Sequence, residues 1–259
     1  MKRLTTMRSI TTWFLCASIS LATSYLRAQE PEGPEAGKAL ASQLSSLEPD
    51  ENSQWTGRLN IKSRNGEAEV IPVRCQVIAG SGHWQVIYTS TAKGDHPAEQ
   101  LTVVHSTNGP TQYLLAKAAK PDAALGKPVV VNGKALEAPF AGSDFWLSEL
   151  GFEFYHWPSQ KRLKGAMRRG QPCYVLESVN TEAKVGDLAK VVTFVDRESG
   201  QPILAEGYRF GELRSSKDFS LGKMTKVNGR WTPKNLEIED RVRKSRTTLE
   251  FDVEAEPKN

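Results

Sequence analysis

The sequence of 259 residues has few histidines and cysteines and none of the common catalytic or nucleotide-binding motifs. Its four histidines show no HxxxH or HxH spacing and have no cysteine nearby, which argues against a structural zinc site. No GxSxG, P-loop or GxGxxG occurs, so neither a nucleophile elbow nor a phosphate-binding loop is indicated. These absences predict a protein that is not an enzyme and uses no cofactor, with an unrecognised hydrolase as an alternative.

The chain begins with an apolar stretch that is too short to span a bilayer. Residues 10–21 form this stretch, whereas a membrane-spanning helix needs about 20 apolar residues. Basic residues precede it, and no acidic residue occurs before Glu30. This pattern predicts a secretory signal peptide over residues 1–28, with cleavage after Ala28. Cleavage near Ser24 and an uncleaved N-terminal anchor are the alternatives.

Export changes the reading of the charge balance. The full chain has 34 Lys and Arg against 30 Asp and Glu, and residues 1–28 contain four basic residues and no acidic one. The exported chain would therefore carry 30 of each sign, and its net balance gives no indication of nucleic acid or anionic lipid as a partner. Cys16 lies in the apolar stretch after the bulky Phe14 and Leu15, which argues against its acylation as a lipoprotein cysteine.

One helical pattern is followed by many strand patterns. Ala36, Leu40, Leu44 and Leu47 predict an amphipathic helix that ends before Pro49. Beyond it, apolar and polar residues alternate in several short runs, as half-buried strands do. The clearest of these apolar positions are Leu59, Ile61, Trp84, Val86, Tyr88, Leu236, Ile238, Leu249, Phe251 and Val253.

Turn signals separate the runs and suggest how the strands are connected. They include Asn65-Gly66, Ser81-Gly82, Asn108-Gly109, Asn132-Gly133, Ser199-Gly200 and Asn228-Gly229. Such dipeptides supply the positive φ of tight hairpin turns, so we predict an antiparallel meander that closes partly into a barrel. The predicted organisation is a signal peptide (1–28), a flexible arm (29–35) and a single β domain (36–259).

An aromatic segment interrupts the strands in the middle of the chain. Six aromatic residues lie within residues 145–157, and Ser143 or Asp144 is a plausible N-cap for a short helix there. The phrase Gly142-Ser143-Asp144-Phe145, followed by Glu149-Leu150, resembles a signature in a divergent branch of the outer-membrane lipoprotein-sorting family, the Lol-type carriers. Residues 170–177 and the order of the C-terminal strands also resemble this family.

The resemblance implies both a fold and a role. The fold is a curved antiparallel sheet that forms an unclosed half β-barrel around one or more short helices. The role is that of a carrier for lipoprotein acyl chains or other apolar cargo in the periplasm of a Gram-negative-type bacterium. Lipidated proteins or acyl chains would be its partners, together with inner- and outer-membrane envelope proteins, and nucleic acid would not.

Two sets of residues are candidates for function or stability. The apolar cavity would be lined by Phe145, Trp146, Leu150, Phe152 and Phe154. If these aromatics instead fill the core, the chain would be a non-catalytic structural or interaction module of an envelope complex. Once Cys16 is removed, Cys75 and Cys173 are left either to form a disulfide or to remain as two buried thiols.

Two basic clusters also occur, and each has two interpretations. One covers residues 161–169 and the other covers residues 241–246. Charges that alternate along strands usually form a solvated face. The alternative is a docking surface for an acidic partner or for lipid headgroups.

Overall fold

The computed structural model describes residues 31–107, 109–222, 224–227 and 230–253, without the side chains of residues 224–227 and 230–233. The chain divides into two units, residues 1–30 and residues 31–259. The predicted signal peptide, Cys16, Asn108 and the turn at residues 228–229 lie outside the described residues. The account below concerns the second unit.

The described part of this unit is dominated by strands. Its helices are α1 (Pro34–Ser45), η1 (Gly133–Glu137), η2 (Phe140–Gly142), α2 (Leu147–Leu150) and η3 (Glu153–His156), where η denotes a 3-10 helix. Its first seven strands are β1 (Ser53–Lys62), β2 (Ala68–Ile78), β3 (His83–Ser90), β4 (Glu99–Ser106), β5 (Gln112–Lys117), β6 (Val129–Val131) and β7 (Ser159–Arg168). The others are β8 (Gln171–Val179), β9 (Leu188–Asp196), β10 (Pro202–Arg209), β11 (Lys217–Leu221), β12 (Met224–Val227), β13 (Arg230–Pro233), β14 (Asn235–Asp240) and β15 (Ser245–Phe251).

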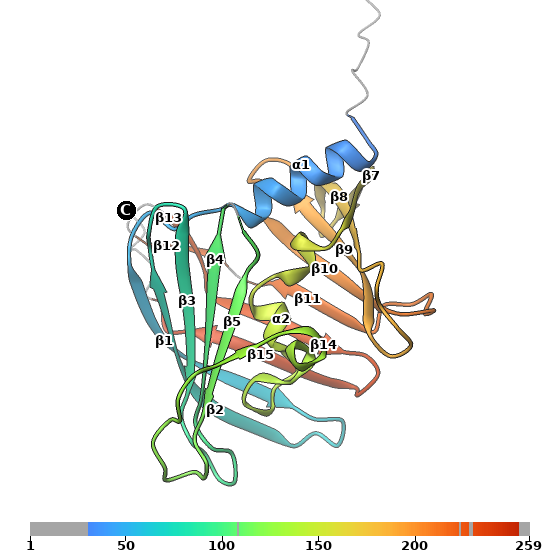
Figure 1. Ribbon diagram of the computed structural model, residues 1–259. Helices are drawn as coiled ribbons and strands as arrows, with labels where there is room; N and C mark the ends of the chain where they lie inside the picture. Colours follow the sequence, from blue (N-terminus) through green and yellow to red (C-terminus); the bar gives the residue numbers. More distant parts are fainter. Residues whose placement is uncertain (1–30, 108, 223, 228–229, 254–259) are drawn as a thin grey trace, which may run out of the picture. The chain divides into compact units, whose positions relative to one another are not determined.

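Thirteen strands form one curved antiparallel sheet that does not close into a barrel (Figure 1). Their order is β6-β5-β4-β3-β2-β1-β15-β14-β11-β10-β9-β8-β7, and β12 and β13 pair separately. The pairing of β1 with β15 joins the N-terminal and C-terminal halves in the middle of the sheet. The predicted fold class, an unclosed half-barrel of antiparallel strands around short helices, is confirmed.

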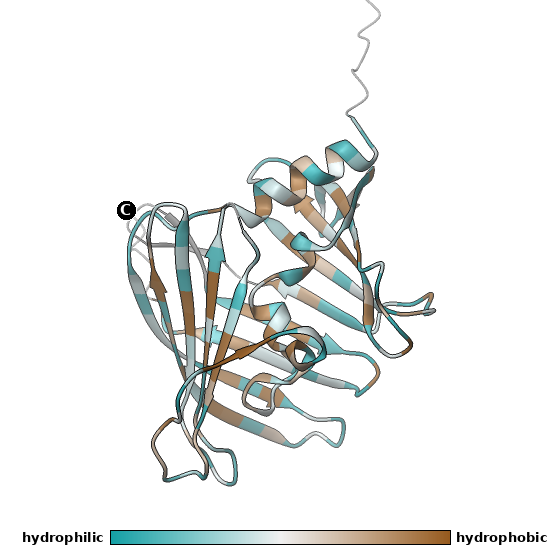
Figure 2. Cartoon of the chain, viewed as in Figure 1, coloured by the Kyte–Doolittle hydropathy of each residue, from teal (hydrophilic) through white to brown (hydrophobic). Residues whose placement is uncertain are grey.

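The strands form where the sequence alternates, because each strand has one face toward the interior. In β14 the alternation buries Leu236, Ile238 and Asp240 and leaves the residues between them partly exposed. The interior face of the sheet carries most of the buried apolar side chains, including Leu59 and Ile71. Figure 2 shows this alternation of hydrophobic and hydrophilic residues along the strands. Burial at about 25 cal/mol per Å² of apolar surface is the main force that holds such a sheet around its contents.

The connection between the two edge strands fills part of the interior. Residues 132–158 lead from β6 to β7 and contain η1, η2, α2 and η3. We call residues 132–158 the crossing segment, and Figure 1 shows it inside the curve of the sheet. Its residues Phe145 and Leu147 are fully buried in the main core, together with the strands they cross. The crossing segment is therefore an internal plug for the half-barrel.

Helix α1 lies against β7, the strand at one edge of the sheet. Leu40 and Leu44 of the predicted amphipathic stripe are buried, whereas Leu47 lies beyond the end of the helix and is half exposed. A Cβ atom on Gly37 would overlap the backbone of Lys161, so glycine allows this close approach. The helix begins at Pro34, inside the segment expected to be a flexible arm, and Gly33 pairs with β7 just before it.

The structure corrects the predicted cap of the short helix in the crossing segment. Helix α2 begins at Leu147, and its N-cap is Trp146 instead of Ser143 or Asp144. The backbone N–H of Trp146 donates to the Glu149 carboxylate at 2.7 Å. Asp144 is directed toward β15 instead, because two hydroxyl groups of that strand donate to it.

Of the two states left open for Cys75 and Cys173, the structure has two free, buried thiols and no disulfide. Cys75 belongs to the main core, whereas Cys173 packs with Val175 and Phe194 in a second cluster. The two cysteines lie on β2 and β8, and six strands of the sheet separate these two.

Candidate functional site

A large cavity lies at one end of the half-barrel. Its volume is about 1020 Å³, at the upper end of the range of roughly 300–1,000 Å³ that ligand pockets occupy. Its lining comes from the ends where β1, β3 and β14 begin and where β2, β4, β11 and β15 finish. The fully buried part of the crossing segment around Phe145 does not line it. The crossing segment thus fills one part of the interior and leaves a hollow in another.

Carbon dominates the inner wall of the cavity. The apolar and aromatic lining residues from the sheet are Trp55, Cys75, Val77, Trp84, Val86, Tyr88, Pro202, Ile203, Leu221, Leu236 and Phe251. Trp55 and Phe251 contact each other with their ring centroids 6.2 Å apart. Such a wall suits an apolar ligand, because it offers few hydrogen-bonding groups.

Two other elements complete the cavity. Leu44 and Leu47 extend to it from α1 and from the chain just beyond that helix. Phe152 and Tyr155 extend to it from the crossing segment, where their rings stack with centroids 6.0 Å apart. Phe152 has φ 53° and ψ 40°, a left-handed backbone conformation that is strained for a bulky residue. The crossing segment therefore holds one aromatic ring against the cavity at a conformational cost.

The rim of the cavity is polar on one side. Arg169 and Gln171 come from the β7–β8 turn, and Glu198, Ser199 and Gln201 come from the β9–β10 turn. A lining that is apolar inside and polar at one side of its rim matches a ligand with an apolar body and a polar head.

Two histidines lie at another part of the lining. His105 stacks on Trp84 with ring centroids 5.0 Å apart, and burial together with the charge of His156 lowers the pKa of His105 to about 4. Burial also lowers the pKa of His156, whose Nε2 is 3.1 Å from Thr111 Oγ1. Both rings are therefore neutral at pH 7, so they add little charge to the cavity.

The cysteine in the cavity wall is not set up as a nucleophile. Burial raises the pKa of the Cys75 thiol to about 12, so it stays protonated at neutral pH.

Among the described residues, no three His, Cys, Asp or Glu side chains are grouped in a way that could hold a metal ion. Within the same residues, no helix is both long enough and apolar enough to cross a membrane.

The structure places only one of the five predicted cavity residues at the cavity. Phe152 lines it, whereas Phe145, Trp146, Leu150 and Phe154 are buried in the core beside it. Trp84, Val86 and Tyr88, which the alternation already marks as one face of a strand, line the cavity instead. Their spacing shows that they point inward, but it does not show whether they meet other side chains or an open space.

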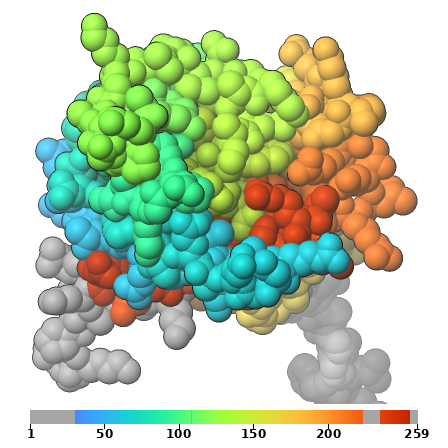
Figure 3. Space-filling model, turned by 90° about the horizontal axis from the view of Figure 1, so that it is seen from below, coloured from blue at the N-terminus to red at the C-terminus, as the bar shows by residue number. Residues whose placement is uncertain are grey.

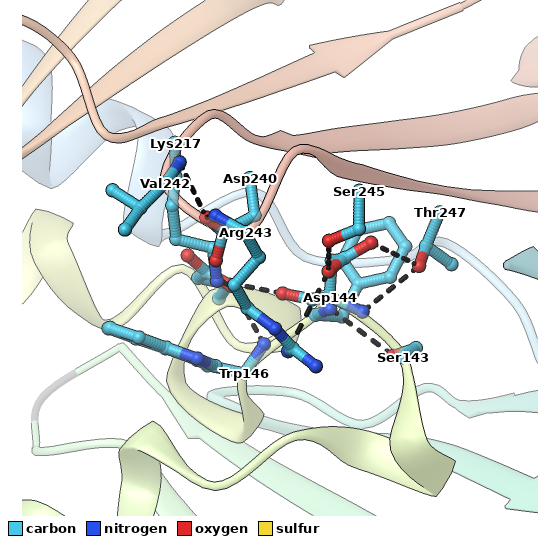
Figure 4. Close-up of polar contacts among 11 residues, drawn as sticks. Ser143, Asp144, Trp146, Lys217, Asp240, Val242, Arg243, Ser245 and Thr247 are labelled. Carbon is cyan, nitrogen blue, oxygen red and sulfur yellow. Dashed lines mark hydrogen bonds and ion pairs between the residues drawn. The ribbon is translucent and has the colours of Figure 1, made fainter. Parts of the chain in front are cut away.

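The motif that carries the family resemblance anchors the crossing segment to the sheet (Figure 4). The carboxylate of Asp144 accepts hydrogen bonds from Ser245 Oγ at 2.5 Å and from Thr247 Oγ1 at 2.9 Å. Lys217 Nζ on β11 donates to the Asp144 carbonyl and to Glu149 Oε2, both at 2.7 Å. Burial raises the pKa of Glu149, while the Lys217 ammonium and the Trp146 N–H oppose that shift. The Asp and Glu of the motif therefore have a structural role and hold the plug in place.

Comparisons with known proteins identify a family whose sequences match this chain. The sequence profile of a family described as "Uncharacterized protein" matches residues 121–256, which is more than half of the chain. The chain belongs to this family. The matched region begins before the crossing segment and runs through the last described strand, so it includes the Asp144 anchor. No curated protein sequence gives a significant match.

Solved structures share the fold at low sequence identity. A DUF1329 family protein from Desulfovibrio piger superimposes with a TM-score of 0.68 and 15% identity, over 86% of this chain and 92% of that one. A proposed outer membrane lipoprotein-sorting protein domain from Vibrio parahaemolyticus gives a TM-score of 0.67 and 18% identity, over 85% and 91% of the two chains. A LolA superfamily protein from Nitrosomonas europaea gives 0.53 and 14%, over 86% and 94%. At the level of the fold, these neighbours confirm the resemblance to lipoprotein-sorting proteins.

Proposed function

We propose that this chain is a periplasmic binding or carrier protein for lipoprotein acyl chains or other apolar cargo in outer-membrane lipoprotein sorting. The observation that carries the proposal is the cavity of about 1020 Å³ with its wall of aromatic and aliphatic side chains. An acyl chain gains about 0.8 kcal/mol for each CH₂ group that leaves water. Binding of this kind needs a dry concave surface and no catalytic group.

The polar side of the rim adds a constraint on the cargo. An acyl chain would lie against Trp84, Val86 and Phe152, and its polar head would lie near Arg169 and Gln171. Arg169 can donate several hydrogen bonds to carbonyl or acidic oxygens of such a head. The fold shared with lipoprotein-sorting proteins supports the same class of cargo.

The proposal includes export and a domain organisation. Residues 1–28 would be removed as a signal peptide, and residues 36–259 would form the carrier domain in the periplasm of a Gram-negative-type bacterium. N-terminal sequencing of the protein recovered from the envelope should therefore begin near Gln29. An intact Met1 in that protein would contradict the proposed cleavage.

The decisive test fills the cavity without disturbing the sheet. Val86 faces the cavity from β3, whereas Val104 is paired with Gln85 on the other face of the adjacent strand. Val86→Trp should lower the affinity for a fluorescent acylated peptide at least tenfold, while Val104→Trp should leave the affinity unchanged. Melting curves should show that both variants are folded.

Native mass spectrometry of protein purified from its own envelope provides the second arm of this test. Co-purified lipid that is present in the wild type and absent from Val86→Trp would support the carrier function. If no acylated ligand binds the wild type and no lipid co-purifies, the carrier function is wrong. The chain would then be a non-catalytic interaction module of the envelope.

A further inference from the structure

Three neighbouring turns at the end of the sheet remote from the cavity form a continuous surface. They comprise residues 180–187 between β8 and β9, residues 209–215 at the β10–β11 connection, and residues 241–244 between β14 and β15. We call these three segments the turn surface. Their strands are neighbours in the sheet, and Figures 1 and 3 both show the turns along the same side of the molecule.

Backbone hydrogen bonds join the three turns to one another. The N–H of Phe210 donates to the Asp187 carbonyl at 3.0 Å, which links the first turn to the second. The N–H of Arg241 donates to the Ser216 carbonyl at 2.9 Å, which links the third turn to the residue that directly follows the second. The turns are therefore held in fixed positions relative to each other and can act as one surface.

Each of the three turns exposes at least one large apolar side chain. Leu213 is 98% exposed, Val185 is 87% exposed, and Phe210 and Val242 are at least half exposed. Four of the ten large apolar side chains exposed in the described residues lie on these short turns. A single exposed apolar residue is ordinary, but a group of them on adjoining turns indicates an interaction site.

Basic residues lie beside these apolar side chains. The turn surface contains six Lys and Arg against three Asp and Glu, although the exported chain as a whole would be balanced. Lys184, Arg214 and Lys244 are all exposed, and each lies within two residues of an exposed apolar residue. One acidic residue, Asp187, is paired with Lys134 of the crossing segment. Arg241 and Arg243 are paired with Asp218 and Asp144, respectively. The positive charge that the turn surface offers to a partner is therefore mainly that of Lys184, Arg214 and Lys244, on the same turns as the apolar side chains.

We propose that the turn surface docks this protein on an anionic lipid bilayer. Val185, Phe210, Leu213 and Val242 enter the headgroup region, while the neighbouring ammonium and guanidinium groups contact lipid phosphates. The apolar side chains lie on separate turns. They can insert into a bilayer without matching pockets, whereas a protein partner would need a surface of complementary shape. Basic residues near an anionic surface add to this apolar contribution.

Docking in this way leaves the cavity free. The cavity is lined from the strand ends opposite to the turn surface, with residues such as Arg169 and Ser199 from the turns of that other end. The bilayer would hold the molecule with its rim exposed to the periplasm. The docking surface does not depend on what the cavity binds.

Sedimentation of the exported protein with lipid vesicles tests the docking surface. Wild type should bind vesicles of phosphatidylglycerol and phosphatidylcholine at about 0.1 M salt, and bind them much less at about 1 M, because salt screens the charges. The combined variant Lys184→Gln, Arg214→Gln and Lys244→Gln should lose roughly a hundredfold in affinity, since each basic residue contributes about a factor of five. The combined variant Val185→Ser, Phe210→Ser and Leu213→Ser should lose at least tenfold.

Matched controls separate the turn surface from general stickiness. Val129 and Val130 on β6 are more than half exposed, and Lys161 and Lys164 on β7 are exposed basic residues. Serine at the two valines and glutamine at the two lysines should leave vesicle binding unchanged. All variants share the same N-terminus, so a difference between them reports on the turns. Phe210→Trp should also show a blue-shifted emission when vesicles are added.

Several outcomes would overturn the docking surface. If the wild type binds no vesicles, the turns would be assigned to an acidic protein or to a second copy of the chain. Unchanged binding in the apolar variant would show attraction by charge alone and no insertion. An equal loss of vesicle affinity in the control variants would show that the docking site does not lie on these turns. Binding of an acylated peptide should be normal in every turn variant, so failure here is distinguishable from failure of the carrier function.

Discussion

The ammonium group of Lys217 lies 2.7 Å from Glu149 Oε2, and both side chains are almost completely buried. The ammonium also lies 4.0 Å from the ring centroid of Trp146, and Lys217 donates to the carbonyl of Asp144. One buried cation on β11 therefore holds three residues of the crossing segment. This arrangement ties the middle of the crossing segment to the sheet.

Removal of one partner of this pair should be far more harmful than removal of both. Lys217→Met should lower the free energy of unfolding by roughly 3–5 kcal/mol, because it leaves the Glu149 carboxylate buried without its counter-charge. The double variant Lys217→Met and Glu149→Met should recover most of that loss. Urea unfolding of the two single variants and the double variant measures the coupling.

The matched control for this pair is an exposed ion pair in the same segment. Lys134 is paired with Glu137 at 2.7 Å, and its side chain is 65% exposed. Lys134→Met should change the stability by no more than about 1 kcal/mol. A double variant at Lys217 and Glu149 that is as unstable as the single ones would show that the two charges are not coupled.

Removal of the Asp144 carboxylate should also destabilise the protein, because this group holds the crossing segment to β15. Asp144→Ala should cost about 1–3 kcal/mol, because the buried hydroxyl group of Thr247 and the partly buried one of Ser245 would lose their acceptor. In this variant, hydrogen exchange should become faster at amides of the crossing segment and change less at amides of the central strands. Asp252→Ala is the control, since Asp252 accepts a hydrogen bond from Thr56 at 2.9 Å on the exposed surface. Equal effects of the two substitutions would contradict an anchoring role for Asp144.

The sequence predicts the strands well because half-buried strands alternate. The run from Leu249 to Phe251 is recognisable without knowledge of its partners, and it forms the end of β15. The role of Asp144 could not be predicted in this way. Local rules suggest a helix cap, whereas its partners Ser245 and Thr247 are about one hundred residues away in the chain. Buried polar contacts of this kind depend on the tertiary arrangement.

The cavity shows a second limit of the sequence. Aromatic crowding in residues 145–157 suggested the lining, yet most of these rings pack against one another and fill the interior. Trp84 and Tyr88 were recognised as the inward face of a strand, and the open space beside them depends on where the crossing segment stops. Alternation predicts which side chains point inward but not how completely the interior is filled.

Gly37 should control the position of the helix over the cavity. Gly37→Val adds side-chain atoms where the backbone of Lys161 already lies, so α1 must move away from β7. We expect a lower melting temperature and at least tenfold weaker binding of an acylated peptide, because Leu44 and Leu47 would be displaced from the cavity. Ala39→Val places the same side chain on the exposed face of α1 and should leave binding unchanged. Normal binding by Gly37→Val would show that the cavity does not need the helix in this position.

His105 should make the protein less stable in acid. Its pKa is about 4 in the folded protein, because the ring is buried against Trp84 and near His156, whereas an unfolded chain has a histidine pKa of about 6.5. Between these two values the unfolded chain binds a proton that the folded protein does not. Stability should therefore fall as the pH drops from about 6.5 to about 4, by up to roughly 3 kcal/mol from this group alone.

NMR titration of the histidine rings measures this directly. The His105 signal should have its midpoint near pH 4, and His105→Gln should reduce the acid-dependent loss of stability measured by urea unfolding. His83→Gln removes a histidine that is hydrogen-bonded to Ser106 on the exposed side, at 3.2 Å, and should leave most of that loss in place. Binding of an acylated peptide should weaken as the pH falls to about 4 and below, where the His105 ring of the folded protein gains its charge, since a charged imidazolium in the cavity wall disfavours an apolar chain. A His105 midpoint near 6.5 would mean that water reaches the ring, and it would contradict a dry cavity at this position.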